Sequence, residues 1–157
     1  MVVHLRNYIR PECFIPNLEE KSREAALRRI VHEVAERGLV KDERGVLEKL
    51  LERESIQSTA VGNGFAIPHC FADEIPGLII IVVRCPDGLE FDSFDGKPTR
   101  ILFLLMGNRQ EYSLHLKVLA RIAWLVKSTA FTGKLVSSTS VQDIVRAIDE
   151  EEAKTPS

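Results

Sequence analysis

Apolar residues recur with helical spacing in three separate stretches of the chain. From about 21 to 37 they fall at i, i+3, i+4 and i+7, the spacing of an amphipathic helix, and Gly38 stands where a C-terminal cap belongs. A second helix is predicted from a cap at Asp42 to about 53, and a last one from a capping box at Ser140 to about 148. The inward-facing positions of these helices are Leu27, Ile30, Val31, Val34, Val46, Leu47, Leu50, Leu51, Val141, Ile144, Val145 and Ile148.

Two other stretches, 77–85 and 99–106, contain apolar runs without polar alternation, which is typical of strands covered on both faces. Pro86-Asp87-Gly88 is a turn signature that predicts the end of the first of these strands, with a short strand at 89–91 after it. The stretch 58–67 predicts two short extended pieces around Gly62-Asn63-Gly64. Residues 1–16, which contain Pro11 and Pro16, are predicted to be irregular or partly extended.

A further helix is predicted from 113 to about 127, followed by a short one at 129–137. The only strongly polar side chains on the longer helix form a narrow strip at Lys117 and Arg121, so we expect this helix to be mostly buried. Helices that flank central buried strands predict an α/β sandwich. The chain length of 157 residues predicts one domain, with a core at about 5–148 and a frayed tail at 149–157.

Composition excludes several classes of protein. The net charge is −2 without a basic block, which argues against binding to nucleic-acid phosphates. The apolar runs are too short to cross a bilayer, and the N-terminus lacks the apolar core of a signal peptide. Cys13, Cys70 and Cys85 match no metal-binding spacing and are expected to be reduced thiols in a cytoplasmic protein. No metal or cofactor is expected, because the four histidines are scattered and no dinucleotide or Walker loop is present.

The most informative histidine, His69, ends a glycine-punctuated apolar loop that begins at Ser58. Pro68 fixes its own φ and biases Ile67 toward an extended conformation, so His69 has little backbone freedom. Neutral imidazole has one nitrogen with a free lone pair at neutral pH, and this pattern therefore indicates a nucleophile. Taken alone, the Pro-His pair would sooner indicate a histidine that merely ends a strand.

The loop resembles the phosphorylated-histidine loop of fructose/mannitol-type (type 2) IIA domains of the bacterial phosphoenolpyruvate-dependent phosphotransferase system. That pattern is Arg-Glu, then Ser-Thr-Gly-(Ile/Val)-Gly-x-Gly-(Ile/Val)-Ala-(Ile/Val)-Pro-His, and it matches Arg53-Glu54 and 58–69 except at Ala60 and Phe65. The resemblance covers about 5–148 and is closest to the stand-alone nitrogen-regulatory IIA proteins. It implies a three-layer-like sandwich in which a mixed sheet has helices on both sides.

The resemblance also implies roles for four residues. His69 would be the phosphorylated nucleophile, and His115 would donate a hydrogen bond to the phosphoryl group. Spacing alone favours a core histidine at 115, because it falls inside the apolar stripe of its helix. Arg53 would neutralise the phosphoryl charge, and the Thr59 hydroxyl would contact a phosphate oxygen or cap a turn. Glu54 would orient Arg53 or His115, or be solvated; Asn63 would serve turn geometry, and Cys70 is treated as incidental.

Under this resemblance the chain is a phosphotransferase component that takes a phosphoryl group from a histidine-containing phosphocarrier protein. Two roles stay open. The favoured one is regulatory, through phosphorylation-dependent binding of target proteins, and the alternative is sugar uptake, with transfer to a IIB domain. A receiver-like domain of a transcriptional activator is a weaker third.

A hypothetical acidic rim would steer a basic partner, although these residues are as readily explained as solvated loop positions: Asp73, Glu74, Glu90, Asp92 and Asp95.

Overall fold

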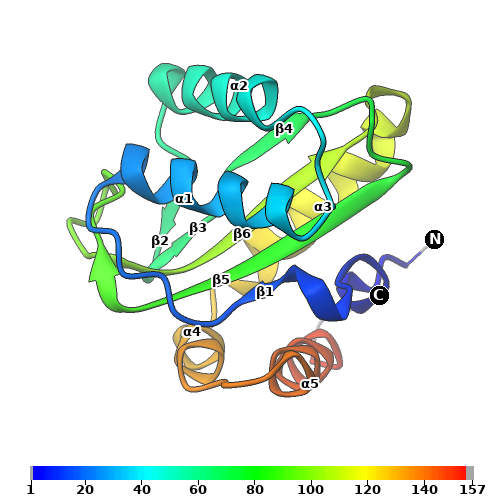
Figure 1. The fold of residues 1–157 in the computed structure, drawn as a ribbon. Helices are drawn as coiled ribbons and strands as arrows, with labels where there is room; N and C mark the ends of the chain where they lie inside the picture. The colour runs from blue at the N-terminus through cyan, green and yellow to red at the C-terminus, as the bar shows by residue number, and fades with distance from the viewer. Residues whose placement is uncertain (1, 155–157) are drawn as a thin grey trace.

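The computed structural model describes residues 2–154, and residues 1 and 155–157 are not described. Its centre is one mixed six-stranded sheet with the strand order β1-β5-β6-β3-β2, in which β4 also pairs with β6 (Figure 1). The two long strands, β5 (Leu78–Leu89) and β6 (Thr99–Gly107), are antiparallel neighbours. Nearly every side chain of Leu78–Val83 and Ile101–Met106 is fully buried, which agrees with the apolar runs of the sequence.

Four short strands complete the sheet, and three of its pairings are parallel. β1 runs parallel to β5, both β3 and β4 run parallel to β6, and β2 is antiparallel to β3. The bounds of these strands are β1 Phe14–Ile15, β2 Ala60–Gly62, β3 Phe65–Ala66 and β4 His69–Phe71. The sheet is therefore mixed, as the resemblance implied.

Helices cover both faces of the sheet, with α1 and α2 on one side and α4 and α5 on the other (Figure 1). The α/β sandwich expected from the sequence is therefore confirmed. The helices are α1 Arg23–Glu36, α2 Glu43–Ile56, α3 Tyr112–Leu125, α4 Thr129–Val136 and α5 Val141–Glu152, with single turns η1 Leu5–Tyr8, η2 Pro11–Cys13 and η3 Arg109–Glu111. None of the helices within residues 2–154 is long and apolar enough to cross a membrane.

Side-chain caps begin the helices where the sequence places them. The Asp42 carboxylate accepts from Gly45 N at 3.0 Å, and the Ser140 hydroxyl accepts from Asp143 N at 3.1 Å. The last helix runs beyond 149, where fraying was expected, because Glu152 is buried and pairs with Arg121 at 2.9 Å. Long-range pairing of this kind leaves no local sequence signal.

Two expectations about individual elements were wrong. Pro86-Asp87-Gly88 does not end a strand but lies inside β5, where the register with β6 shifts between Arg84 and Leu89. Gly88 accommodates the irregularity with a φ of 85°. Helix α3 is not mostly buried, because one of its faces carries half-exposed apolar side chains: Tyr112, Leu116 and Trp124.

The turn between β2 and β3 is held from two sides by Asn63. Its backbone N–H donates to Asp95 Oδ2 at 3.1 Å, and its side-chain Nδ2 donates to the carbonyl of Val126, just past α3, at 3.0 Å. Asn63 adopts a φ of 55°, which most side chains avoid and asparagine tolerates. One residue therefore supplies both the turn geometry and a tie to α3.

We expect Asn63→Ala to lower the free energy of unfolding by about 1–2 kcal/mol, because it removes a hydrogen bond and strains the backbone. Asn63→Gly removes only the hydrogen bond, since glycine accepts a positive φ, and should cost less. Urea denaturation of the wild type, Asn63→Ala and Asn63→Gly measures the contribution of the hydrogen bond and that of the backbone strain. Equal stabilities of the alanine and glycine variants would show that the conformation at residue 63 contributes nothing.

Candidate functional site

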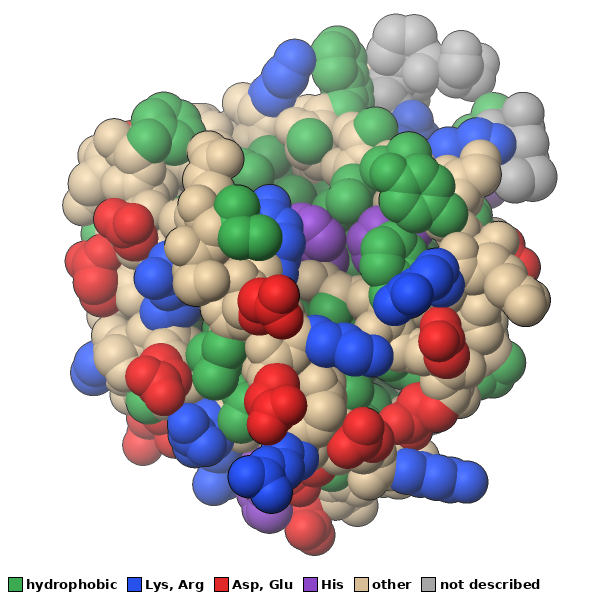
Figure 2. Space-filling view, turned by 90° about the horizontal axis from the view of Figure 1, so that it is seen from above, with side chains coloured by type: hydrophobic (Ala, Val, Ile, Leu, Met, Phe, Trp, Pro, Cys, Tyr) green, Lys and Arg blue, Asp and Glu red, His purple; other side chains and the backbone are tan. Residues whose placement is uncertain are grey.

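A cavity of about 600 Å³ opens between α2 and α3, beside β4. Figure 2 looks onto this hollow, where two histidine side chains lie side by side with hydrophobic and Lys or Arg side chains around them. The structure thus brings His69, His115 and Arg53 to the same cavity. Its lining comprises Lys49, Glu52, Arg53, Ile56, His69, Cys70, Phe71, Arg109, Tyr112, His115, Leu116 and Leu119.

His69 is positioned by the strand that it begins. β4 pairs with the end of β6, with His69 opposite Leu105, and Leu105 N donates to the carbonyl of Pro68 at 2.9 Å. The preceding carbonyl, that of Ile67, lies 2.8 Å from His69 Nδ1. A carbonyl only accepts, so Nδ1 carries the proton and donates. The other ring nitrogen, Nε2, therefore holds the free lone pair.

Burial and charge keep this lone pair available. Burial lowers the pKa of His69 below its ordinary value, the hydrogen bond to Ile67 opposes that shift, and the positive charge of Arg53 adds to it. The guanidinium is held at the end of α2, where Nη1 donates to the carbonyl of Gln57 at 2.9 Å. At neutral pH the imidazole is accordingly uncharged and able to attack an electrophile.

His115 lies behind His69, with the two ring centroids 5.7 Å apart. It is only 2% exposed, and neither ring nitrogen has a hydrogen-bond partner within the described part of the chain. Burial, with a smaller contribution from His69, lowers the pKa of His115 to about 4. A buried N–H without a partner costs about 1–3 kcal/mol, so a ligand that accepts from it gains that free energy on binding.

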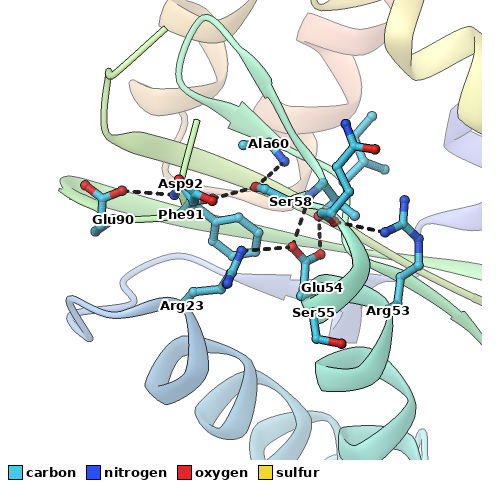
Figure 3. A network of polar contacts seen from close by, with 12 residues as sticks. Arg23, Arg53, Glu54, Ser55, Ser58, Ala60, Glu90, Phe91 and Asp92 are labelled. Atoms are coloured by element: carbon cyan, nitrogen blue, oxygen red, sulfur yellow. Dashed lines mark hydrogen bonds and ion pairs between the residues drawn. The ribbon is translucent and has the colours of Figure 1, made fainter. Parts of the chain in front are cut away.

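Thr59 does not line the cavity and is almost fully buried. Its hydroxyl and its backbone N–H both donate to the carboxylate of Glu54, the latter at 3.0 Å. Arg23 of α1 approaches the same carboxylate at 3.8 Å, and Figure 3 shows Glu54 between Arg23 and the connection that leads to β2. Glu54 is therefore neither solvated nor directed at Arg53 or His115; it fastens the start of the loop to two helices.

Cys70 and the residues of the hypothetical acidic rim supply no reactive or charged group to the cavity. Cys70 lines the cavity, but burial raises the pKa of its thiol to about 12, so it is not a thiolate at neutral pH. None of the five residues of the hypothetical acidic rim lines the cavity, and carboxylates of this group bind loop backbone instead. Sequence reasoning missed the cations at positions 49 and 109 and the apolar side chains at 56, 112 and 116, because helical spacing does not reveal which exposed face borders a cavity.

Comparison with known proteins shows the class of protein that carries this fold and site. Residues 7–151 match the family model "Phosphoenolpyruvate-dependent sugar phosphotransferase system, EIIA 2". A nitrogen regulatory protein of Bradyrhizobium diazoefficiens is 35% identical over 140 residues, which cover 89% of this chain and 91% of that protein. The fructose-specific EIIA component of Haloferax volcanii is 30% identical, covering 85% and 90%. The chain therefore belongs to the EIIA 2 family and is a component of a phosphotransferase system.

A solved structure agrees with this assignment at the level of the fold. The nitrogen regulatory protein IIA-Ntr from Neisseria meningitidis superposes with a TM-score of 0.81 at 23% identity, over 90% of this chain and 97% of that one. The chain therefore shares the fold of that solved structure.

Burial of neutral His115 should make the fold sensitive to acid. Its pKa is about 4 in the folded chain against an ordinary 6.5, so between these values only the unfolded chain takes up the proton. Titration of His115 leaves the free energy of unfolding unchanged above pH 6.5 and lowers it by about 3 kcal/mol as the pH drops to 4. Other groups also titrate there, so the test compares the wild type with His115→Phe, which keeps a ring but does not titrate.

In urea denaturation at pH 7 and pH 4, the stability difference between the two proteins should shift by about 3 kcal/mol in favour of His115→Phe. Parallel pH profiles for the two proteins would contradict a buried neutral histidine.

Proposed function

We propose that this chain is a phosphocarrier that accepts a phosphoryl group on Nε2 of His69 from the phosphohistidine of a small carrier protein. The observation that carries the proposal is the hydrogen bond from Nδ1 to Ile67, which fixes the tautomer and leaves Nε2 as the nucleophile in an open cavity. Membership of the EIIA 2 family supports the transfer of phosphoryl groups in general.

The transfer balances without any co-reactant. The P–N bond of the donor breaks while a bond forms between phosphorus and Nε2 of His69. The donor ring leaves as neutral imidazole and keeps the proton on its other nitrogen, while His69 keeps its Nδ1 proton on the Ile67 carbonyl. Donor and acceptor are the same chemical group, so the step is close to reversible.

Arg53 and His115 supply the electrostatic stabilisation that such a step needs. Charge develops on the phosphoryl oxygens in the transition state, and preorganised donors lower its free energy. The guanidinium of Arg53 supplies positive charge, and the unpartnered N–H of His115 donates a hydrogen bond. Thr59 does not contact the phosphoryl group itself. Its hydroxyl donates to Glu54 and holds the loop in place, so its proton is not free for a phosphate.

The favoured role is regulatory, with the phosphorylation state of His69 controlling the binding of target proteins. The relative with the higher identity supports this role, because it is a nitrogen regulatory protein that the chain covers almost end to end. The fructose-specific relative supports the alternative, in which the phosphoryl group passes to a IIB domain. Chasing the phosphorylated chain with a fructose-type IIB domain separates the two, because only the uptake role requires rapid loss of the label.

Incubation with phosphoenolpyruvate, enzyme I and a histidine phosphocarrier should label the chain at His69. We expect His69→Ala to abolish the label and His32→Ala to retain it, because His32 is an exposed residue of α1 outside the cavity. Mass-spectrometric mapping of the phosphosite under alkaline conditions gives the readout. Label that persists in the His69→Ala variant would end the assignment.

Replacing Arg53 tests its electrostatic role. In Arg53→Gln the pKa of His69 should rise, because the guanidinium holds it down, and transfer should slow by about 10–100-fold. NMR titration of the His69 ring and the transfer rate are the two measurements. Arg44→Gln, an exposed arginine of the same helix that pairs with Glu48, is the matched control and should change neither. An unchanged His69 titration in Arg53→Gln would contradict the electrostatic coupling.

A further inference from the structure

A continuous series of contacts links the N-terminus of α1 to the ring of His69. Nη1 of Arg23 lies 3.8 Å from Oε1 of Glu54, and this oxygen accepts from the N–H of Thr59 at 3.0 Å. The carbonyl of Thr59 accepts from the N–H of Ile67 at 3.0 Å. The carbonyl of Ile67 in turn accepts from Nδ1 of His69 at 2.8 Å. A displacement of the Glu54 carboxylate is therefore passed to the candidate nucleophile through two residues of the loop.

The charge of Glu54 has the wrong sign for stabilising a phosphoryl group. Burial is the main cause of the lowered pKa of His69, and of its two charged neighbours Arg53 lowers that pKa while Glu54 raises it. A phosphoryl dianion on the ring is attracted by a guanidinium and repelled by a carboxylate. Figure 3 shows Arg23 and Arg53 on opposite sides of Glu54, and of these three only Arg53 lines the cavity. Glu54 therefore does not assist the transfer step through its charge.

Stability of the fold does not call for a carboxylate at this position either. Glu54 is 4% exposed, and its ion pair with the partly exposed Arg23 spans 3.8 Å. Removing a buried charge from water often costs more than such a pair returns, so that an apolar side chain of similar size is equally stable. Arg23 is also the first residue of α1, where the positive end of the helix dipole disfavours a cation. Both side chains are thus unfavourable for local stability, and a positional role accounts for them.

We infer that Glu54 and Arg23 are positioning residues that hold His69 in the orientation from which Nε2 attacks. Glu54 acts through Thr59 and Ile67, and Arg23 acts through Glu54. This role rests on the proposed function, because it names further residues on which the same site depends. A misplacement of about 1 Å at the reacting atoms can slow a reaction about 100-fold. Contacts outside the cavity therefore have a large effect when they set the position of the ring.

Glu54→Gln keeps the shape of the side chain but removes its charge and one of its two acceptor oxygens. We expect transfer from a saturating histidine phosphocarrier to slow about 10-fold, because the ring is no longer held. The KM for the carrier should not change, since the variant alters no residue that lines the cavity. Glu48→Gln is the matched control, because Glu48 is an exposed residue of the same helix that pairs with Arg44, and it should react at the wild-type rate.

The tautomer of His69 separates a positioning role from a merely structural one. At a pH where the ring is neutral, nitrogen chemical shifts measured by NMR report which ring nitrogen holds the proton. We expect the proton on Nδ1 in the wild type and partly on Nε2 in Glu54→Gln, because the acceptor at Ile67 is displaced. Thr59→Val removes only the hydroxyl and should change the shifts and the rate in the same direction, even if Glu54→Gln folds poorly. Thr59→Ser keeps the hydroxyl and should restore both.

Arg23→Gln tests the outer end of the series. Because a partly exposed ion pair contributes little, we expect transfer to slow by about 2–5-fold. The same substitution in the Glu54→Gln background should have no further effect, since Arg23 acts through that carboxylate. Arg28→Gln is the matched control, an exposed arginine of the same helix that pairs with Glu24, and should equal the wild type. Independent, additive losses in the double variant would overturn the role of Arg23.

The failure of this role can be distinguished from the failure of the proposed function. Wild-type rates and an unchanged His69 tautomer in folded Glu54→Gln and Thr59→Val would overturn the positioning role and leave the phosphocarrier in place. Slower transfer with an unchanged tautomer and a raised KM would also overturn it, because the damage would then lie in carrier binding. Absence of any carrier-dependent label on wild-type His69 would overturn both.

Discussion

The placement of the candidate nucleophile depends on an interruption in the sheet. Residues 65–71 run alongside β6, first as β3 and then as β4, and the two strands are separated by Ile67 and Pro68. Proline has no N–H to donate to a strand ladder, so Pro68 keeps only the bond from Leu105 N to its carbonyl. The carbonyl of Ile67 then accepts the ring proton of His69. A local defect in backbone pairing thereby fixes both the position and the tautomer of a side chain.

A second constraint joins this loop to the helices above it. Glu54 belongs to the last turn of α2, and its buried carboxylate accepts hydrogen bonds from the hydroxyl and N–H of Thr59. Arg23 of α1 lies near the same carboxylate. The turn at Asn63 adds a tie to the end of α3. Since α2 carries Arg53 and α3 carries His115, the loop is fastened to two of the elements that supply charge or donors to the cavity. The geometry of the site is thus a property of the whole layer rather than of the loop.

Local signals in the sequence were sufficient for most of the fold. The caps at Asp42 and Ser140 and the apolar runs of β5 and β6 each act over a few residues, and they placed their elements correctly. Pro86–Gly88 was misread because a proline-glycine turn signal can be absorbed into a long strand as an irregularity. The exposed face of α3 was missed for a different reason: an apolar stripe has the same spacing whether it faces a core or a cavity. The partner of Thr59 lies only five residues away, but the motif does not reveal that the Glu54 carboxylate turns back to it. The cations at positions 49 and 109 reach the same cavity from distant segments, which spacing does not encode.

His115 is the part of the structure with the widest consequence. In the free protein, two ring nitrogens are shut away from water with nothing to bind within the described chain. Under the proposed function, a phosphoryl group on His69 accepts a hydrogen bond from His115 and relieves that deficit, so the phosphorylated protein should be the more tightly folded of the two forms. Folding equilibrium and phosphoryl-transfer potential are then linked quantities: a substitution that relaxes the pocket around this ring also changes how readily the group is passed on. A partner that senses the modification can therefore respond to altered rigidity as well as to added charge.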